Sequence, residues 1–202
     1  MRVLSITAVI LLFGSSLIRA DSQAPPQPLV FTSEGGGSAL FTMVPAKLDA
    51  DYKVTKKPFG IAYKLSEEGV LEELYRTSGW YSFRVFVSDD GKYLVQMGPW
   101  NAGHRPEKDH LAVAFYKNGK LLKSYSTADL VQDPDKVMAS ASHYMWLAPH
   151  YNLKLSAGEA YSLRPRLDYD NKFTLNTIDG WTYEFDATNG KIASTKKTKK
   201  AN

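Results

Sequence analysis

Hydroxyl and imidazole side chains lie close together at one point of this sequence. Ser140-Ala141-Ser142-His143 places two serines within three residues of a histidine, and a hydroxyl beside an imidazole is what nucleophilic catalysis uses. The sequence has no Gly-x-Ser-x-Gly turn, which presents the nucleophilic serine in many hydrolases, and neighbours in sequence need not meet in space. A hydrolase that uses His143 with Ser140 or Ser142 is therefore the alternative hypothesis, and a non-catalytic protein is the leading one.

Metal ligation is the second chemistry that the residue types allow. The chain contains four histidines, and Glu107 and Asp109 accompany two of them: His104, His110, His143 and His150. Structural zinc sites usually combine ligands at close spacing, such as His-x3-His, and no pair of histidines here has that spacing. We therefore predict no metal site and no cofactor.

A glycine-rich segment resembles a phosphate-binding loop in one respect only. Glu34-Gly35-Gly36-Gly37-Ser38 has the glycines, but no Lys-Ser/Thr pair follows them. That pair supplies the ligands of the nucleotide phosphates and of their magnesium ion. We therefore expect a flexible turn between two strands and no bound nucleotide.

Aromatic residues at strand ends and in loops give the second candidate site. We predict that a group of these rings binds a partner, because aromatic side chains give a large contact area at low entropic cost. The predicted binding residues are Trp80, Trp100, His143, Tyr144 and Trp146. The partner class stays open between a protein, a peptide and a glycan. The other interpretation is that the same rings close the ends of the core.

The charge of the chain argues against a nucleic-acid partner. The formal net charge is +4 at pH 7. Without Arg2 and Arg19 near the N-terminus and the four lysines near the C-terminus, 19 basic residues stand against 21 acidic ones. Nucleic-acid surfaces need basic side chains gathered on one face, so we predict no nucleic acid.

The N-terminal segment has the pattern of a secretory signal. Arg2 is followed by an apolar run from Val3 to Phe13, and Ala20 precedes polar residues. This predicts a signal peptide over residues 1–20 and an exported protein, either periplasmic or extracellular. An uncleaved anchor is the other interpretation, but the run is shorter than the about 20 residues that span a bilayer. We predict no transmembrane segment after cleavage.

The rest of the chain divides into three parts. Residues 21–28 carry three prolines and are predicted to be a flexible leader. Residues 29–193 are predicted to form a single all-β domain, and residues 194–202 a basic disordered tail. The chain has no cysteine, so no disulfide can form, but a mature chain of about 180 residues can bury an adequate core without one.

Alternating apolar residues and tight turns indicate the fold class. The pattern predicts an all-β protein of antiparallel hairpins or a meander, in propeller-like or sandwich sheets. Ser126 and Asp129 form a variant capping box that predicts one short helix, and 135–141 is a candidate for a second, both near residues 127–141. We also expect strands over 143–147 and 161–163.

One hairpin can be predicted in detail. Asn118-Gly119 favours the positive φ angles of a two-residue turn, which sets Phe115 opposite Leu122 on the core face. Tyr116 and Tyr125 then fall on the other face, which is also apolar, so we expect the hairpin to be covered on both sides.

Three hairpins support a resemblance. They are Ser88-Asp89-Asp90-Gly91-Lys92-Tyr93-Leu94-Val95, Phe115-Tyr116-Lys117-Asn118-Gly119-Lys120-Leu121 and Asp179-Gly180-Trp181-Thr182-Tyr183. With these hairpins, the segment 60–192 resembles small secreted bacterial proteins of unknown function with β-propeller-like hairpins. The resemblance implies a fold style and an exported location, and it implies no activity. Four strands per blade would give roughly three blades, fewer than a closed propeller uses, so we expect packed sheets or an open partial ring.

The leading hypothesis is an exported, non-catalytic binding or interaction domain of unknown ligand. An exported hydrolase and a structural envelope protein are the two alternatives.

Overall fold

Three antiparallel sheets of four strands make up most of the protein, as the computed structural model describes it for residues 23–149 and 156–197. The first sheet has the order β1-β2-β5-β6 (Leu29–Thr32, Ala39–Val44, Phe59–Leu65, Leu71–Ser78). The second has the order β7-β8-β9-β10 (Val85–Val87, Tyr93–Met97, Leu111–Lys117, Lys120–Ser126). The third has the order β13-β14-β15-β16 (Arg166–Leu167, Lys172–Asn176, Trp181–Asp186, Lys191–Lys197). The predicted all-β fold is confirmed.

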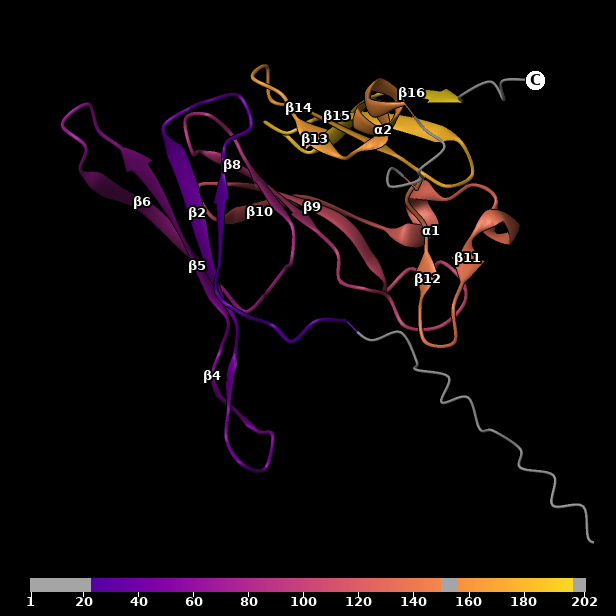
Figure 1. Cartoon of the computed structure of the whole chain (residues 1–202), viewed down its shortest axis with the longest axis horizontal. Helices are drawn as coiled ribbons and strands as arrows, with labels where there is room; N and C mark the ends of the chain where they lie inside the picture. Colours follow the sequence, from indigo (N-terminus) through magenta and orange to yellow (C-terminus); the bar gives the residue numbers. More distant parts are fainter. Residues whose placement is uncertain (1–22, 150–155, 198–202) are drawn as a thin grey trace, which may run out of the picture.

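Short elements fill the connections between these strands (Figure 1). The hairpin β3–β4 (Lys47–Leu48, Val54–Lys56) is inserted in the first sheet, and β11–β12 (Met138–Ala139, Tyr144–Met145) lies between the second and third sheets in the chain. The helices are α1 (Thr127–Leu130), the 3₁₀ turn η1 (Pro134–Lys136) and α2 (Ala157–Leu163). No helix among the described residues is long and apolar enough to cross a membrane.

The second sheet lies between the other two and is covered on both faces along β7, β8 and β9. Along β8 and β9, neighbouring side chains enter different cores, because successive residues of a strand point to opposite faces. Leu94 and Tyr116 pack toward the first sheet, whereas Val95 and Phe115 pack toward the third. We call these the first and second cores. The expected two-sided cover of the β9–β10 hairpin is right for β9, which is buried from Ala112 to Tyr116. It is wrong for β10, because β10 is the edge strand of the sheet and is exposed from Lys120 to Ser124.

The sheets meet one another along their first strands. β7 contacts both β1 and β13, so the inner edges of the three sheets converge, as the inner strands of propeller blades do. In Figure 1 the first sheet lies to the left of the second sheet and at an angle to it, and the third sheet lies above the second. The arrangement gives the molecule a shared inner edge where loops of all three sheets can line one cavity.

The register of the β9–β10 hairpin differs from the predicted one after its turn. Lys120 pairs with Lys117 as expected, but a β-bulge after Leu121 sets Lys123 opposite Phe115. One extra residue moves every following side chain to the other face. The prediction that Leu122 faces Phe115 is therefore wrong, and Tyr125 lies on the Phe115 face, with ring centroids 6.3 Å apart.

The prediction of one or two short helices near 127–141 is confirmed, and the strand predicted at 161–163 is wrong. Ser126 caps α1 through a full capping box with Asp129. The second candidate segment, 135–141, is helical only at its start, where it overlaps η1, because Met138 and Ala139 pair as β11. The expected strand at 161–163 belongs to α2, whose capping box joins Ser156 and Glu159. The sequence pattern Ser-x-x-Glu was present and was the signal for this helix.

The chain ends differ in part from the predicted boundaries. The predicted signal peptide, residues 1–20, lies outside the described residues, as do residues 198–202. Gln27 in the predicted flexible leader is held, since the Tyr81 hydroxyl donates to its carbonyl oxygen at 2.7 Å. The predicted disordered tail begins too early, because 194–197 belong to β16 and pair with β15.

The glycines between β1 and β2 are required by a close approach of two loops. A Cβ on Gly37 would lie 2.5 Å from Cα of Asp89, in the turn between β7 and β8. A Cβ on Gly35 would lie 2.6 Å from an oxygen of the Asp89 carboxylate. The loop therefore docks the first sheet on the second and fixes the backbone beside Glu34.

Candidate binding cleft

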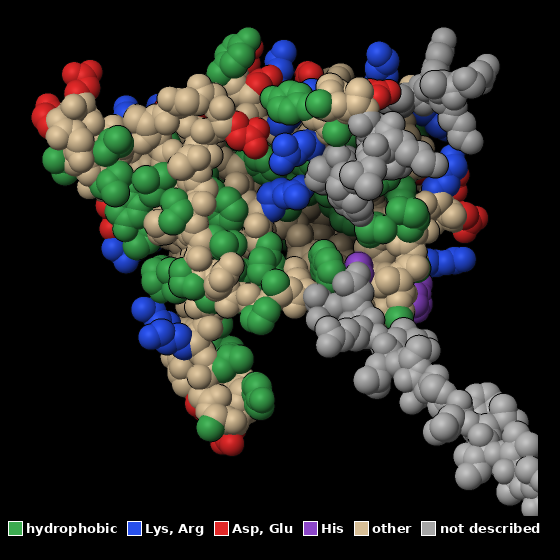
Figure 2. All heavy atoms as spheres, viewed as in Figure 1, with side chains coloured by type: hydrophobic (Ala, Val, Ile, Leu, Met, Phe, Trp, Pro, Cys, Tyr) green, Lys and Arg blue, Asp and Glu red, His purple; other side chains and the backbone are tan. Residues whose placement is uncertain are grey.

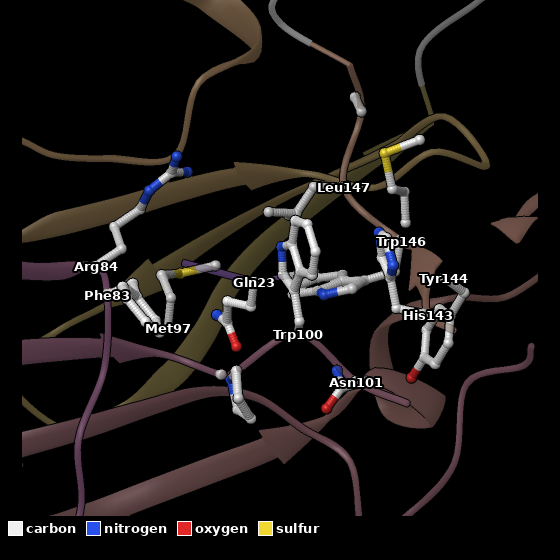
Figure 3. A pocket seen from close by; sticks show the side chains of 14 residues that line it. Gln23, Phe83, Arg84, Met97, Trp100, Asn101, His143, Tyr144, Trp146 and Leu147 are labelled. Atoms are coloured by element: carbon white, nitrogen blue, oxygen red, sulfur yellow. The ribbon is translucent and has the colours of Figure 1, made fainter. Parts of the chain in front are cut away.

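A cleft of about 470 Å³ opens beside the inner edge of the second sheet (Figure 3). Three segments form most of it: Phe83 and Arg84 before β7, 97–101 at the end of β8, and 143–148 around β12. Gln23 adds a side chain from the N-terminal segment. The volume lies in the range of small-molecule sites, and the lining is largely apolar, through Phe83, Met97, Pro99, Trp100, Trp146, Leu147 and Ala148.

Four of the five predicted binding residues line this cleft: Trp100, His143, Tyr144 and Trp146. Trp80 does not. Its indole stacks between Phe41 and Tyr116, with centroid distances of 5.9 and 5.3 Å, and packs against the first core. Trp80 thus follows the other interpretation of the aromatic residues, as a ring that closes a core.

Trp100 presents the most accessible ring of the cleft. Its indole is 45% exposed, whereas Trp146 is only 7% exposed. The Trp100 ring lies parallel to the imidazole of His143, with centroids 4.0 Å apart and planes 11° apart. An isolated β-bridge between Ala102 and His143 holds the two backbone segments together. The imidazole therefore acts as a support for one face of the indole.

Tyr144 forms the polar end of the cleft, and its hydroxyl is hydrogen-bonded by residues outside the cleft. Its hydroxyl lies 2.9 Å from Nδ1 of His110 and 2.7 Å from Oγ1 of Thr127. Burial raises the pKa of the Tyr144 hydroxyl, so the phenol is protonated at neutral pH and can take part in both bonds. Tyr144 thereby connects the 107–110 loop and the start of α1 to the cleft.

The serines next to His143 are parts of a turn. Oγ of Ser140 lies 2.8 Å from Nδ1 of His143, and it also accepts the backbone N–H groups of His143 and Ser142 at 3.2 and 3.3 Å. The Ser140 backbone N–H donates to the His143 carbonyl at 2.7 Å. These bonds close the β11–β12 hairpin, a common use of serine hydroxyls. A hydroxyl held in this way would have to leave the turn to attack a substrate.

One other group of possible ligands forms in the loop before β9. One ligand atom from each of Glu107, Asp109 and His110 lies within 4.8 Å of the others. The two acids are exposed, and exposed carboxylates beside a histidine are common without a metal. The three residues are near neighbours in the sequence, where Glu107 and Asp109 already stood out beside the histidines, and the loop brings them together through the hydrogen bond from the His110 N–H to the Glu107 carbonyl at 3.3 Å.

Sequence reasoning missed two polar residues of the cleft, Arg84 and Asn101. Arg84 lines it at the end opposite Tyr144 (Figure 3). Asn101 is buried, and its side-chain nitrogen has no hydrogen-bond partner among the described residues. Arg84 stands in an alternating stretch where a polar residue is expected on the solvent side, so no local signal marks it as a site residue.

Comparisons with known protein families, with curated proteins and with solved structures find no match to this chain.

Proposed function

We propose that this chain is an exported, non-catalytic binding protein whose cleft takes an apolar ring-bearing group. The observation that carries the proposal is the convergence of Trp100, His143 and Trp146 on one cleft from two distant segments of the chain. An exposed indole above an apolar floor gives a large contact area to a flat ligand group. Export is supported by the signal-like pattern of residues 1–20.

The composition of the lining favours an apolar ligand group over a sugar. Phe83, Met97 and Leu147 give the cleft walls that cannot hydrogen-bond. A glycan would leave many hydroxyl groups without partners against such walls, and each buried, unpaired polar group costs free energy. A small apolar molecule or an apolar side chain of a peptide fits these walls better.

The hydrolase alternative has less support from the geometry. Ser140 is engaged in the β11–β12 turn, and Oγ of Ser142 is 3.4 Å from Nδ1 of His143, a long contact for a hydroxyl that would transfer its proton. The structural-envelope alternative has no specific observation in its favour.

A fluorescence titration tests the binding proposal. The neutral dye 1-anilinonaphthalene, which brightens in apolar sites, is titrated into the purified protein. We expect saturable binding, and Trp100→Ala should weaken it at least about fivefold, since an aromatic contact is worth roughly 1 kcal/mol or more. Tyr169→Ala is the matched control, because Tyr169 is a 76% exposed aromatic outside the cleft. Equal affinity for Trp100→Ala and the native protein would refute the proposal.

Export has a separate test. The full chain is expressed in a bacterial host, and the mass of the protein recovered from the periplasm and the medium is measured. A mass that lacks residues 1–20 is expected. Retention of the whole chain in the cytoplasm would contradict the exported location without affecting the binding test.

A further inference from the structure

A second cavity, of about 320 Å³, lies at the shared inner edge of the three sheets. Its lining comes from β1 and the loop after it, from the start of β7, and from the residues just before β13. Arg84 lines both this cavity and the aromatic cleft. A guanidinium therefore stands at the junction of an apolar site and a second, more polar one.

Positive charge is in excess around this second cavity. Arg84 and Arg164 line it together with a single carboxylate, Glu34. Arg166, in β13, acts electrostatically on the same carboxylate. Figure 2 shows Lys or Arg side chains beside the hollow at the centre of this face of the molecule. Three cations thus face one anion at the convergence of the sheets.

The two arginines that line the cavity form no ion pair within the described part of the chain. The ion pairs found there join other residues: Arg76–Glu73, Lys92–Asp90, Arg105–Asp135 and Lys136–Asp133. Arg166 donates to the Ser162 carbonyl at 3.0 Å, whereas no hydrogen bond of the Arg84 or Arg164 side chain is found among the described residues. Guanidinium groups bind carboxylates and related anions through two parallel N–H bonds, so these donors are available to a ligand.

The electrostatics agree with an unsatisfied cationic site. Burial, and then the charge of Arg164, lowers the pKa of Arg84. Burial raises the pKa of Glu34, even though the three arginines oppose that change. Glu34 supplies at most one negative charge against the three positive charges of Arg84, Arg164 and Arg166, so an added anion would meet an attractive field.

We infer that the natural ligand is a small organic anion, with its apolar ring in the aromatic cleft and its carboxylate, sulfate or sulfonate bound by Arg84 and Arg164. This inference rests on the proposed function, because it places the apolar part of the ligand against Trp100. The anionic group can belong to a free small molecule or to the C-terminal carboxylate of a peptide that ends in an aromatic residue. Both present the same chemistry to the site.

A pair of dyes that differ in one anionic group tests the inference. The sulfonate 1-anilinonaphthalene-8-sulfonate is titrated beside the neutral 1-anilinonaphthalene. We expect the native protein to bind the sulfonate more tightly. Arg84→Gln should weaken sulfonate binding about tenfold or more and neutral-dye binding by a clearly smaller factor, because it removes a charge-assisted hydrogen bond that only the sulfonate can accept. Glu34→Gln should strengthen sulfonate binding.

Two control variants make the result specific. Arg76→Gln removes the same charge from the exposed strand β6, where Arg76 pairs with Glu73 at 2.6 Å, and should change neither affinity. Arg84→Lys keeps the charge, loses the paired donors, and should give an intermediate sulfonate affinity. If Arg84→Gln fails to fold by circular dichroism, Arg164→Gln and Arg84→Lys take its place with the same expected order.

The outcomes separate this inference from the proposed function. Equal binding of both dyes by the native protein, or an equal loss of both in Arg84→Gln, would overturn the anion site and leave the aromatic cleft intact. Failure of the neutral dye to bind, or its indifference to Trp100→Ala, would refute the proposed function itself.

Displacement of the sulfonate dye distinguishes the two sources of the anion. N-acetyltryptophan represents the free small molecule, and Gly-Gly-Trp with a free C-terminus represents the peptide end. Displacement by either acid supports the inference, and the more effective one identifies the source. Their C-terminal amides should displace the dye at least about tenfold less well. Equal displacement by the acids and the amides would contradict it.

Discussion

Trp100 and His143 stack as a parallel pair although 43 positions of sequence numbering separate them. Trp100 belongs to the loop after β8, and His143 to the turn between β11 and β12. The ring contact and the backbone bridge from Ala102 to His143 join these two segments, and the accessible indole depends on both. We therefore expect the imidazole to act mainly by positioning Trp100.

A stacking role for His143 predicts different results for two substitutions. His143→Ala removes the support and should weaken neutral-dye binding about two- to tenfold, the range that corresponds to an aromatic pair worth roughly 0.5–1.5 kcal/mol. His143→Phe keeps a flat ring and should bind within about twofold of the native protein. Equal, severe loss in both variants would instead indicate that a ring nitrogen is required, either by the ligand or by the Ser140 hydroxyl 2.8 Å from Nδ1, and would contradict the stacking role.

A structural role for Ser140 makes a prediction that concerns both activity and stability. Ser140→Ala removes the acceptor of two backbone N–H groups in the β11–β12 turn and should cost about 1 kcal/mol of unfolding free energy, as loss of a typical hydrogen bond does. Hydrolysis of p-nitrophenyl acetate should be the same for the native protein and the variant. An esterase rate that disappears in Ser140→Ala and in His143→Phe would favour the hydrolase instead.

The parts of the fold that local sequence encodes were predictable. Asn118 and Gly119 both adopt positive φ, 48° and 74°, as their residue types favour, so the turn follows from two residues. The bulge after Leu121 does not follow from local sequence, because residues far away in the chain contact the strand that comes after it. The Tyr125 hydroxyl donates to the Gly190 carbonyl at 3.0 Å, across 65 positions of the sequence, and no local pattern records that bond.

The site residues likewise fall into those that local sequence marks and those that it does not. Aromatic residues in loops are unusual enough to mark Trp100 and Trp146 from the sequence. Trp80 has the same local signal, and only the packing of Phe41 and Tyr116 around it shows that it belongs to a core. No local sequence pattern marks Arg84 as a site residue, because its charge has a role only beside Glu34 and Arg164. Those two residues come from the other two sheets or their loops.

Phe115 is the central ring of the second core, and its truncation is the sharpest test of the sheet packing. It is fully buried, with ring centroids of Phe185 and Phe173 at 5.1 and 6.0 Å. Phe115→Ala should cost about 3–5 kcal/mol, through lost burial and a cavity. Urea unfolding measures the cost. Leu121→Ala, at a 58% exposed position of the same hairpin, should change stability by less than about 0.5 kcal/mol, and a near-neutral Phe115→Ala would contradict the packing.

A substitution at Gly119 should be costly for two reasons, backbone strain and a steric clash. Gly69 is the control, because a substitution there meets only the strain. A side chain at position 119 would adopt a φ of 74°, and its Cβ would lie 2.8 Å from the Arg76 carbonyl oxygen. Gly69 has a φ of 80°, and a Cβ added there would have no neighbouring atom within 4 Å. Gly69→Val should therefore cost only the backbone strain, about 1–3 kcal/mol, and Gly119→Val should cost more. Equal urea midpoints for the two variants would show that the β9–β10 turn does not pack on β6.

The capping box of α1 predicts a stability that depends on pH. The backbone N–H of Ser126 donates to the Asp129 carboxylate at 2.8 Å, and this bond, followed by the Ser126 hydroxyl, lowers the pKa of Asp129 in the folded protein. A carboxyl whose folded pKa lies below its unfolded value of about 3.9 stabilises the protein above that value. The contribution is lost as pH falls through the folded pKa, because both states are then protonated.

Asp129→Asn should therefore destabilise the protein at pH 7 and approach the stability of the native protein near pH 2. Ser126→Ala removes the hydroxyl that accepts the Asp129 N–H at 3.1 Å and should cost about 0.5–2 kcal/mol of unfolding free energy. Much of this cost should remain at low pH, because a neutral hydroxyl accepts the bond whether or not Asp129 is ionised. Urea midpoints of both variants and of the native protein at pH 7, 4 and 2 measure the difference in stability between variant and native protein. The contributions of all other titrating groups cancel in that difference. A cost of Asp129→Asn that stays constant down to pH 2 would show that the carboxylate charge has no part in the cap.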